Sequence, residues 1–314
     1  MQVLLTGATG FIGSSVLGCL VARGDTVRVL VQPEAADQVR YHDRLEVIVG
    51  SLANSDVLTE ATQDVEIVYH LAQILPIPST TWQDLRRVNV HGTENLLHAS
   101  VMGVRRLVFL SSVLVYSPVP WPSRWPITEP FPRRAHGNAA LRKYGQSKIE
   151  AEDLILDFHR QYGLEYVILR PTVAYGPGAG FVEQLLRQLV SQPWLALARG
   201  AQLGVMQWVH VSDLAEALVL AGTCSGAANE VFNIAGRKAI TVQDVAVAVR
   251  ELLGPFLPLD GTRFQSHVEG KSRPKFSIEK AQTMLGYTPR VQFPEGLDEI
   301  LAAMEHRRPL DPRP

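Results

Sequence analysis

The sequence has little of what marks secreted, membrane-spanning or nucleic-acid-binding proteins. It holds only two cysteines, Cys19 and Cys224, whose separation along the chain fits neither a disulfide framework nor a zinc site. No apolar run reaches the roughly 18 residues that a bilayer span requires, and no signal-peptide pattern precedes the first predicted strand. The 30 Lys and Arg residues nearly balance the 31 Asp and Glu residues, so no net charge attracts nucleic acid or an anionic membrane. These absences predict a cytoplasmic protein with no metal, membrane or nucleic-acid partner.

Short apolar runs rich in Val, Ile and Leu recur along the chain, as is typical of strands buried on both faces of a parallel sheet. They lie at residues 2–6, 26–31, 45–49, 65–70, 106–111 and 165–170. Segments with helical periodicity lie at residues 11–23, 54–62, 83–102, 141–162, 181–191, 212–222 and 241–253. This alternation predicts an α/β fold with a doubly wound parallel sheet and right-handed crossovers.

One stretch, residues 117–138, breaks this alternation. It contains six prolines interleaved with Trp121, Trp125 and Phe131. So many prolines exclude a helix or a central strand, which predicts a long ordered loop.

A glycine-rich turn follows the first predicted strand and opens the first predicted helix. Gly7, Gly10 and Gly13 recur at every third position after Thr6. Glycines let a backbone turn tightly and approach a pyrophosphate, whose charge then lies at the N–H groups of a helix N-terminus. Because strand, turn and helix occur in the required order, the motif predicts nucleotide binding rather than a plain turn.

This spacing and an ordered set of further motifs resemble the extended short-chain dehydrogenase/reductase family, also called the NAD-dependent epimerase/dehydratase family. The resemblance extends over nearly the whole chain. The matching motifs are His70-Leu71-Ala72, Asn89-Val90-His91-Gly92-Thr93, Ser111-Ser112 with Tyr116, Tyr144-Gly145-Gln146-Ser147-Lys148, Arg170-Pro171 with Tyr175-Gly176-Pro177-Gly178, and His210-Val211-Ser212-Asp213. It implies a Rossmann fold with a smaller C-terminal substrate lobe.

The resemblance also implies which residues hold the cofactor. They are Gly7, Gly10, Phe11, Ile12, Gly13, Gln32, Ser51, Leu52, Leu71, Ala72, Gln73, Asn89, Tyr144, Lys148, Pro171, Thr172 and Val173. The residue after the second strand discriminates NAD from NADP, because an acid there binds the ribose hydroxyls and an arginine accommodates the 2′-phosphate. Gln32 is neither, and Arg28 and Arg40 are the nearest cations. The cofactor is therefore NAD or NADP, with NAD favoured. For Asn89, a helix cap is an equally good interpretation.

Tyr144 and Lys148 are four residues apart in a predicted helix and so share one face. An adjacent ammonium favours the phenolate and lowers the pKa of a tyrosine. The family resemblance adds Ser112 as the group that hydrogen-bonds the reacting oxygen. Ser112, Tyr144 and Lys148 are thus the predicted catalytic residues, with Tyr144 as the acid or base that accompanies hydride transfer.

The substrate region departs from the family's sugar-nucleotide enzymes. The dehydratases carry an Asp-Glu pair where this chain has Val113-Leu114, and the epimerases carry an asparagine and an arginine where it has Val173 and Met206. Losing an arginine removes a charge-assisted contact to a diphosphate. These departures favour a small, non-nucleotide substrate, with Trp121, Trp125 and Met206 as candidate contacts beside Phe131 and Trp208.

The prediction is an NAD(P)-dependent oxidoreductase that acts on a hydroxyl/carbonyl pair of a small-molecule substrate. The alternatives are a nucleotide-sugar epimerase and, outside enzymes, a cofactor-sensing regulatory protein. The nucleotide-binding domain is expected at 1–172 with a return at 207–235, and the substrate lobe at 173–206 and 236–314. The resemblance also implies a homodimer formed by the helices at 83–102 and 141–162.

Overall fold

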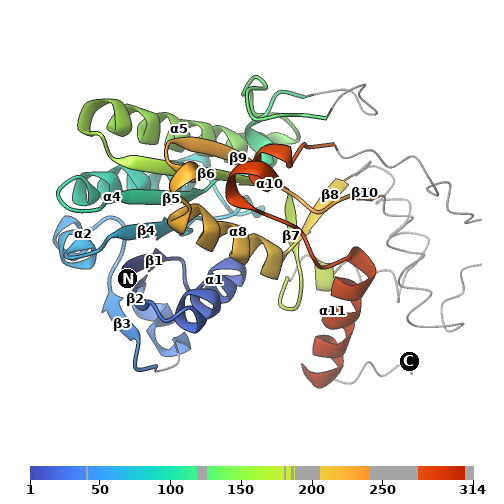
Figure 1. Cartoon of the computed structure of the whole chain (residues 1–314), viewed down its shortest axis with the longest axis horizontal. Helices are drawn as coiled ribbons and strands as arrows, with labels where there is room; N and C mark the ends of the chain where they lie inside the picture. The colour runs from blue at the N-terminus through green and yellow to red at the C-terminus, as the bar shows by residue number, and fades with distance from the viewer. Residues whose placement is uncertain are drawn as a thin grey trace, which may run out of the picture.

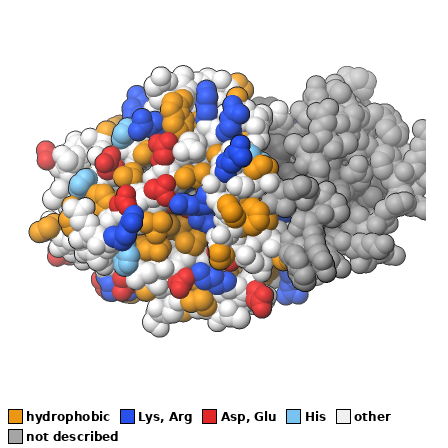
Figure 2. All heavy atoms as spheres, turned by 90° about the horizontal axis from the view of Figure 1, so that it is seen from above, with side chains coloured by type: hydrophobic (Ala, Val, Ile, Leu, Met, Phe, Trp, Pro, Cys, Tyr) orange, Lys and Arg blue, Asp and Glu red, His pale blue; other side chains and the backbone are white. Residues whose placement is uncertain are grey.

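The computed structural model describes residues 1–39, 42–118, 126–179, 182–184, 187, 206–240 and 275–307. Among these residues, no helix is long and apolar enough to cross a bilayer. Figure 2 looks onto one face of the molecule, where basic and acidic side chains are interspersed among apolar ones. The balance of charge in the sequence is thus also found locally on this face.

A seven-stranded parallel sheet forms the centre of the structure (Figure 1). Its strand order is β3-β2-β1-β4-β5-β6-β9, so the chain winds outward from β1 in one direction and then in the other. Ligands of such sheets bind outside the carboxyl ends of the strands where the direction reverses, here between β1 and β4. The strands are β1 (Gln2–Thr6), β2 (Thr26–Val31), β3 (Leu45–Val49), β4 (Ile67–His70), β5 (Arg106–Leu110), β6 (Glu165–Pro171) and β9 (Glu230–Ile234). The doubly wound α/β fold predicted from the sequence is therefore correct.

Helices cover both faces of this sheet, and alternate strand residues pack against each layer. Val3 and Leu5 of β1 belong to the core that includes residues of α1 (Phe11–Ala22), α8 (Val211–Thr223) and α10 (Glu279–Leu285). Leu4, between them, belongs to the core on the other face, with residues of α2 (Ser55–Thr62), α4 (Gly92–Ser100) and α5 (Ala139–Tyr162). Burial on both faces explains why these strands are apolar almost throughout.

The helix predicted over 83–102 is three segments rather than one. A helical turn, α3 (Trp82–Leu85), leads into a π-helical stretch, η2 (Arg86–His91), and then into α4. Thr81 and Asp84 form a capping box that fixes the start of α3. Single π-helical turns recur at functional sites, and this one carries Asn89. Periodicity did not reveal the interruption, because a π turn hardly changes which residues are apolar.

A second, smaller sheet was not predicted. It has the order β10-β8-β7, from β7 (Val173–Tyr175), β8 (Met206–His210) and β10 (Ala239–Ile240). The C-terminal helix α11 (Phe293–Arg307) packs beside it through Phe293, which contacts Tyr175 and Trp208. β8 joins this sheet although it falls in the predicted return segment. β7 and β10, with three and two residues, are too short to carry a periodic signal, and β8 was not among the predicted strands either. The division into a nucleotide-binding domain (1–172 and 207–235) and a substrate lobe (173–206 and 236–314) remains a prediction.

Several predicted features fall outside the described residues. They are the helix at 241–253, most of the helix at 181–191, the side chains of Trp121 and Trp125, and that of Met206. The described short helical turns are η1 (Pro33–Gln38), η3 (Val113–Val115) and η4 (Ser225–Ala227).

Candidate functional site

The glycine-rich turn between β1 and α1 is packed too tightly for side chains. Gly7 has a φ of +78°, and a Cβ on it would lie 2.7 Å from the backbone nitrogen of Ala72. A Cβ on Gly13 would lie 1.9 Å from the carbonyl oxygen of Gly7. Gly7 therefore lets the end of β1 approach the segment after β4, and Gly13 lets α1 begin directly against the turn.

The N-terminus of α1 has the donors that a pyrophosphate needs. Gly10, its N-cap, makes no side-chain cap, and the first turn holds no acidic residue. The N–H groups of Phe11, Ile12 and Gly13 thus begin the helix without a carboxylate or hydroxyl from the N-cap to satisfy them. Free helix N–H groups and the positive end of the helix dipole favour a bound anion. The predicted dinucleotide fits this turn.

Arg28, in the middle of β2, is committed to other partners. Its guanidinium bonds the carboxylate of Glu46 at 2.8 Å and the carbonyl oxygen of Gln63 at 2.7 Å, as well as two further carbonyls at the end of α2. It is therefore not available to a 2′-phosphate. Gln32 is exposed and precedes η1, and its side chain makes no cap there. Arg40 lies outside the described residues.

The other predicted cofactor residues lie on two segments. Ser51 accepts a hydrogen bond from the Ala53 N–H at 3.3 Å, and the Leu52 side chain lies against Gly92, where a Cβ would be 2.9 Å from it. At the end of β6, the N–H of Thr172 donates to the carbonyl of Ile234 at 2.9 Å. Pro171 and Val173 flank Thr172 as the end of β6 and the start of β7. These segments lie at carboxyl ends of strands in the main sheet, and no hydrogen bond between described residues joins one to the other.

His70, at the end of β4, connects its own strand with β1 and α4. Its Nε2 lies 2.9 Å from the Thr93 hydroxyl, which itself donates to the carbonyl of Asn89 at 2.8 Å. The Thr93 oxygen must therefore accept from His70, which leaves Nδ1 to accept from the Thr6 hydroxyl at 2.8 Å. Burial, and then the charge of Lys148, lower the pKa of His70 to about 3. The ring is a neutral connector, not a proton donor in catalysis.

Asn89 fixes the segment that follows β4. Its side-chain oxygen accepts from the N–H of Ile74 at 2.9 Å, and its nitrogen donates to the Ile74 carbonyl and to the Ser147 hydroxyl, both at 3.2 Å. Asn89 is buried within η2 and caps no helix, so the helix-cap interpretation is wrong. Its side chain instead attaches the Ala72–Ile74 backbone to α5.

Tyr144 and Lys148 share a face of α5, as the spacing predicted, and both are buried. The Tyr144 hydroxyl donates to Oε1 of Gln73 at 2.9 Å. Burial raises the pKa of Tyr144, and the bond to Gln73 only partly offsets this. The expected lowering is therefore wrong for the protein without ligands, because removing the phenolate from water outweighs its neighbours.

The amine of Lys148 lies in an apolar environment. Its Nζ lies 4.1 Å from the centre of the Phe109 ring. Burial lowers the pKa of Lys148 to about 7, although the carboxylate of Glu152 acts in the other direction. Within the described residues, no carboxylate lies within ion-pair distance of Lys148. The charged and neutral forms of Lys148 are therefore both populated near neutral pH.

Ser112 begins the short turn η3, where its hydroxyl accepts from the N–H of Leu114 at 3.2 Å. α5 packs directly on this turn, since a Cβ on Gly145 would lie 2.5 Å from the Leu114 carbonyl oxygen. The turn led by Ser112 thus lies against the helical turn that carries Tyr144. Among the described residues, no hydrogen bond joins the Ser112 hydroxyl to Tyr144 or Lys148.

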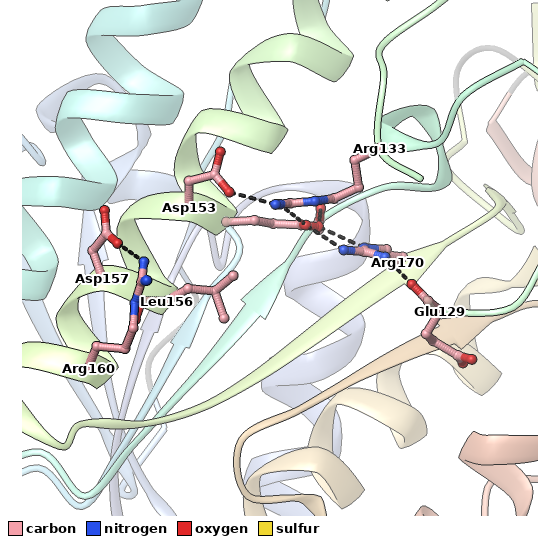
Figure 3. A network of polar contacts seen from close by, with 9 residues as sticks. Glu129, Arg133, Asp153, Leu156, Asp157, Arg160 and Arg170 are labelled. Atoms are coloured by element: carbon pink, nitrogen blue, oxygen red, sulfur yellow. Dashed lines mark hydrogen bonds and ion pairs between the residues drawn. The ribbon is translucent and has the colours of Figure 1, made fainter. Parts of the chain in front are cut away.

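Glu152, one helical turn beyond Lys148, is the centre of a buried polar network that the sequence did not reveal (Figure 3). Its carboxylate is fully buried and bonds Arg170 at 2.9 and 2.7 Å, Arg133 at 3.0 Å and the Ser111 hydroxyl at 2.5 Å. Arg170 also donates to the Tyr116 hydroxyl at 3.0 Å. The signal for Glu152 was its spacing, since residues four apart share a helix face.

The network joins the strand ends around the site. Ser111 precedes Ser112, Arg170 precedes Pro171, and Arg133 comes from the proline-rich loop. Arg133 and Arg170 both bond Oε2 of Glu152, and a dashed line in Figure 3 joins Arg133 to Asp153 as well. The carboxylates of Glu152 and Asp153 together balance the charges of these two cations, which would otherwise repel each other.

Of the predicted aromatic contacts, the two that are described lie in packed clusters. Trp208 is buried and packs edge to face on Tyr175, with ring centres 6.0 Å apart. Phe131 packs on Tyr116, with ring centres 6.3 Å apart. Both observations favour a packing role. Within the described ranges, no group of three His, Cys, Asp or Glu side chains is placed to hold a metal.

The fold and the site define a nucleotide-binding α/β enzyme with a tyrosine and a lysine on one helix face. The chain belongs to the NAD-dependent epimerase/dehydratase family, whose model matches residues 3–235. The cofactor named in the family's description is NAD, which agrees with NAD as the favoured cofactor. The curated relatives include decarboxylases, a ketoreductase and a dehydratase, all enzymes, which argues against a regulatory sensor.

Three relatives illustrate the range of the similarity. UDP-N-acetyl-alpha-D-glucosaminuronate decarboxylase of Bacillus cytotoxicus is 27% identical, with 96% of each chain covered. A farnesyl-dihydroquinoline-oxide ketoreductase of Stigmatella aurantiaca is 25% identical, also with 96% of each chain covered. The structure of UDP-glucose 4-epimerase of Thermotoga maritima, solved with UDP-glucose, is 25% identical with a TM-score of 0.79, covering 98% of this chain and 99% of that one.

Proposed function

We propose that the protein is an NAD-dependent enzyme that acts on a sugar hydroxyl of a nucleotide sugar, with epimerisation as its reaction. The observation that carries the proposal is the pairing of Tyr144 and Lys148 on the buried face of α5, behind a glycine turn suited to a dinucleotide. Similarity to a UDP-glucose epimerase and to a UDP-sugar decarboxylase supports the substrate class. It favours the epimerase alternative over the non-nucleotide substrate preferred from the sequence.

NAD, when bound, supplies a reversible hydride acceptor. The pyrophosphate would be held by the N–H groups of Phe11, Ile12 and Gly13, and the adenosine ribose would lie at Gln32. The backbone at Ala72 closes on Gly7 and would border the cofactor. Thr172 and Val173 would meet it from the end of β6.

The chain's own residues would move the proton. Tyr144 takes the hydroxyl proton of the substrate as it is oxidised, and returns one when the carbonyl is reduced from the other face. Lys148 stabilises the phenolate while it is charged, and Ser112 donates to the reacting oxygen. Burial keeps water from competing for these hydrogen bonds. Epimerisation needs no further acid or base, which agrees with Val113-Leu114 in place of the Asp-Glu pair of dehydratases.

A second candidate is the reduction of a less polar ketone. Its support is Val173 in place of the epimerases' asparagine, Met206 in place of their arginine, and the similarity to the Stigmatella ketoreductase. Without those two polar residues, a diphosphate would lose strong contacts. The same tyrosine chemistry would serve either substrate, so binding decides between them.

The test is a comparison of two ligand classes. UDP-sugars and hydrophobic ketones are offered to the NAD-loaded protein, and melting temperature, product formation and cofactor absorbance are followed. We expect a rise in melting temperature with a UDP-sugar and conversion to its epimer, lost in Tyr144→Phe with binding retained. Turnover of a ketone without binding of any sugar nucleotide would instead support the reductase.

We further propose that the protein is a homodimer in which the segments 83–102 and 141–162 of two copies meet. The proposal comes from the family resemblance. Light scattering at micromolar concentration should give about twice the chain mass of 34.6 kDa. A mass of one chain would refute it.

A further inference from the structure

Both ends of Tyr144 belong to one hydrogen-bonded ring. Its hydroxyl donates to Oε1 of Gln73 at 2.9 Å, and the next residue, Ile74, donates its N–H to Asn89 at 2.9 Å. Asn89 donates to the Ser147 hydroxyl at 3.2 Å, and Ser147 donates to the backbone carbonyl of Tyr144 at 2.7 Å. The ring thus closes through the backbone of residues 73 and 74 and through α5.

The position of Gln73 is set by the fold on both sides. Its preceding neighbour, Ala72, donates its N–H to the Thr6 hydroxyl at 3.2 Å and lies against Gly7. Its following neighbour, Ile74, is held at both N–H and carbonyl by Asn89. With the backbone fixed at both flanks, the side chain is presented to Tyr144 rather than free to turn to solvent.

The Gln73 amide can serve both protonation states of Tyr144. As long as Tyr144 is a phenol, Oε1 accepts its proton. Within the described residues the amide nitrogen of Gln73 has no protein partner, so its N–H donors are available. Rotating the amide by half a turn would direct one of these N–H groups at Tyr144, because the carbonyl oxygen and the NH2 group of a primary amide are bonded to the same carbon.

We infer that Gln73 is a further catalytic residue, which accepts from the Tyr144 phenol and donates to its phenolate. The inference rests on the proposed function for the reaction itself. When a substrate carbonyl is reduced, the Tyr144 O–H bond breaks and its proton goes to the carbonyl oxygen, while a hydride from the reduced nicotinamide adds to the carbonyl carbon. The negative charge left on Tyr144 then receives the N–H of Gln73. Oxidation is the same step reversed.

The two hydrogen bonds differ in strength, which gives the amide its effect. A bond from N–H to a phenolate is charge-assisted and about twice as strong as one from a phenol to an amide oxygen. The amide therefore stabilises the phenolate more than the phenol. This matters here because burial raises the pKa of Tyr144, and because Lys148 is only partly charged near neutral pH.

The first test needs neither substrate nor cofactor. Tyr144 is replaced by 3-nitrotyrosine, a phenol that ionises in an accessible pH range and whose phenolate absorbs visible light, so position 144 alone is observed. In this protein, Gln73→Met should raise the pKa of the nitrophenol by about one pH unit. Gln73→Glu, which places a negative charge at the same atoms, should raise it further. Gln146→Met, the same change at an exposed glutamine of α5, should leave it unchanged. Equal values for Gln73→Met and Gln146→Met would overturn the inference.

The second test uses turnover of the otherwise unmodified protein. Gln73→Met should lower kcat about tenfold and move the tyrosine limb of the kcat–pH profile to higher pH, with KM and NAD affinity little changed. A loss of NAD affinity with an unchanged profile would make Gln73 a cofactor contact and refute the inference. If no nucleotide sugar is turned over but the nitrophenol shifts as stated, the proposed function fails while the role of Gln73 in the ionisation of Tyr144 stands.

Discussion

Arg170 and Glu152 form a two-pronged ion pair in the protein interior, with nitrogen–oxygen distances of 2.9 and 2.7 Å. Both side chains are almost completely buried. Paired geometry of this kind is among the stronger contacts of a folded protein. It connects α5 one turn beyond Lys148 with the residue before Pro171, so the helix of the predicted catalytic pair and a predicted cofactor segment are joined through it.

Breaking this pair should be costly. In Glu152→Gln, the buried Arg170 loses its carboxylate partner, and we expect the free energy of unfolding to fall by about 3–5 kcal/mol. Glu150→Gln is the control, because Glu150 is more exposed and its partners, Arg86 in an ion pair and Gln146 in a hydrogen bond, lie at the surface. That change should cost about 1 kcal/mol or less. Urea unfolding of the two variants measures the difference. Equal losses of free energy of unfolding would show that the buried pair stabilises the protein no more than the surface pair does.

The glycine turn gives a matched pair of substitutions in one helix. Gly13→Ala would place a Cβ 1.9 Å from the Gly7 carbonyl, so we expect a loss of about 1–3 kcal/mol of stability and loss of NAD binding. Gly18→Ala meets no atom within 4 Å and should stabilise the protein by up to about 1 kcal/mol with unchanged NAD binding. Thermal unfolding and fluorescence titration with NAD test both. Unimpaired NAD binding in Gly13→Ala would contradict the proposed pyrophosphate site.

Lys148 should make the free energy of unfolding depend on pH in the neutral to alkaline range. Its pKa is about 7 in the folded protein and 10.5 as the ordinary value, so the unfolded chain binds more protons between these limits. Stability from this group is therefore fully present above about pH 10.5 and is lost as pH falls through about 7. Wild type should gain stability over Lys148→Met as pH rises from 7 to 10. No such gain should appear against Lys143→Met, where the lysine is exposed. If the free energy of unfolding of wild type and of Lys148→Met changed in parallel with pH, the pKa of Lys148 would not be lowered in the folded protein.

The residue after β2 should determine which dinucleotide binds. Because Arg28 is committed to Glu46 and to carbonyls of α2, we expect NAD to bind more tightly than NADP. Gln32→Arg should increase NADP affinity about tenfold or more by contacting the 2′-phosphate. Arg28→Met should leave the NAD/NADP ratio unchanged. Fluorescence titration with each dinucleotide measures the ratio, and a fall in NADP affinity in Arg28→Met would mean that Arg28 reaches the phosphate after all.

Much of the site could be predicted because its signals are local. The turn at Gly7 and Gly13 requires residues without side chains within a few positions of one another, and Tyr144 and Lys148 share a face because a helix repeats every 3.6 residues. Six of the seven strands of the main sheet were predicted, because burial on both faces makes such strands apolar. The seventh, β9, which contains Glu230 and Asn233, was not. Short strands such as β7 and β10, and the π-helical turn at Asn89, left no comparable pattern.

The sequence by itself thus determined the fold class, the glycine turn and the tyrosine–lysine pair, since each depends on neighbours in the chain. Only the tertiary structure decided what surrounds them. Gln73 meets Tyr144 across 71 positions of sequence, and Glu152 meets Arg170 from another element. The tertiary structure also reversed the expected direction of the Tyr144 pKa, because desolvation depends on the atoms that pack around a group and not on the residues beside it in the chain.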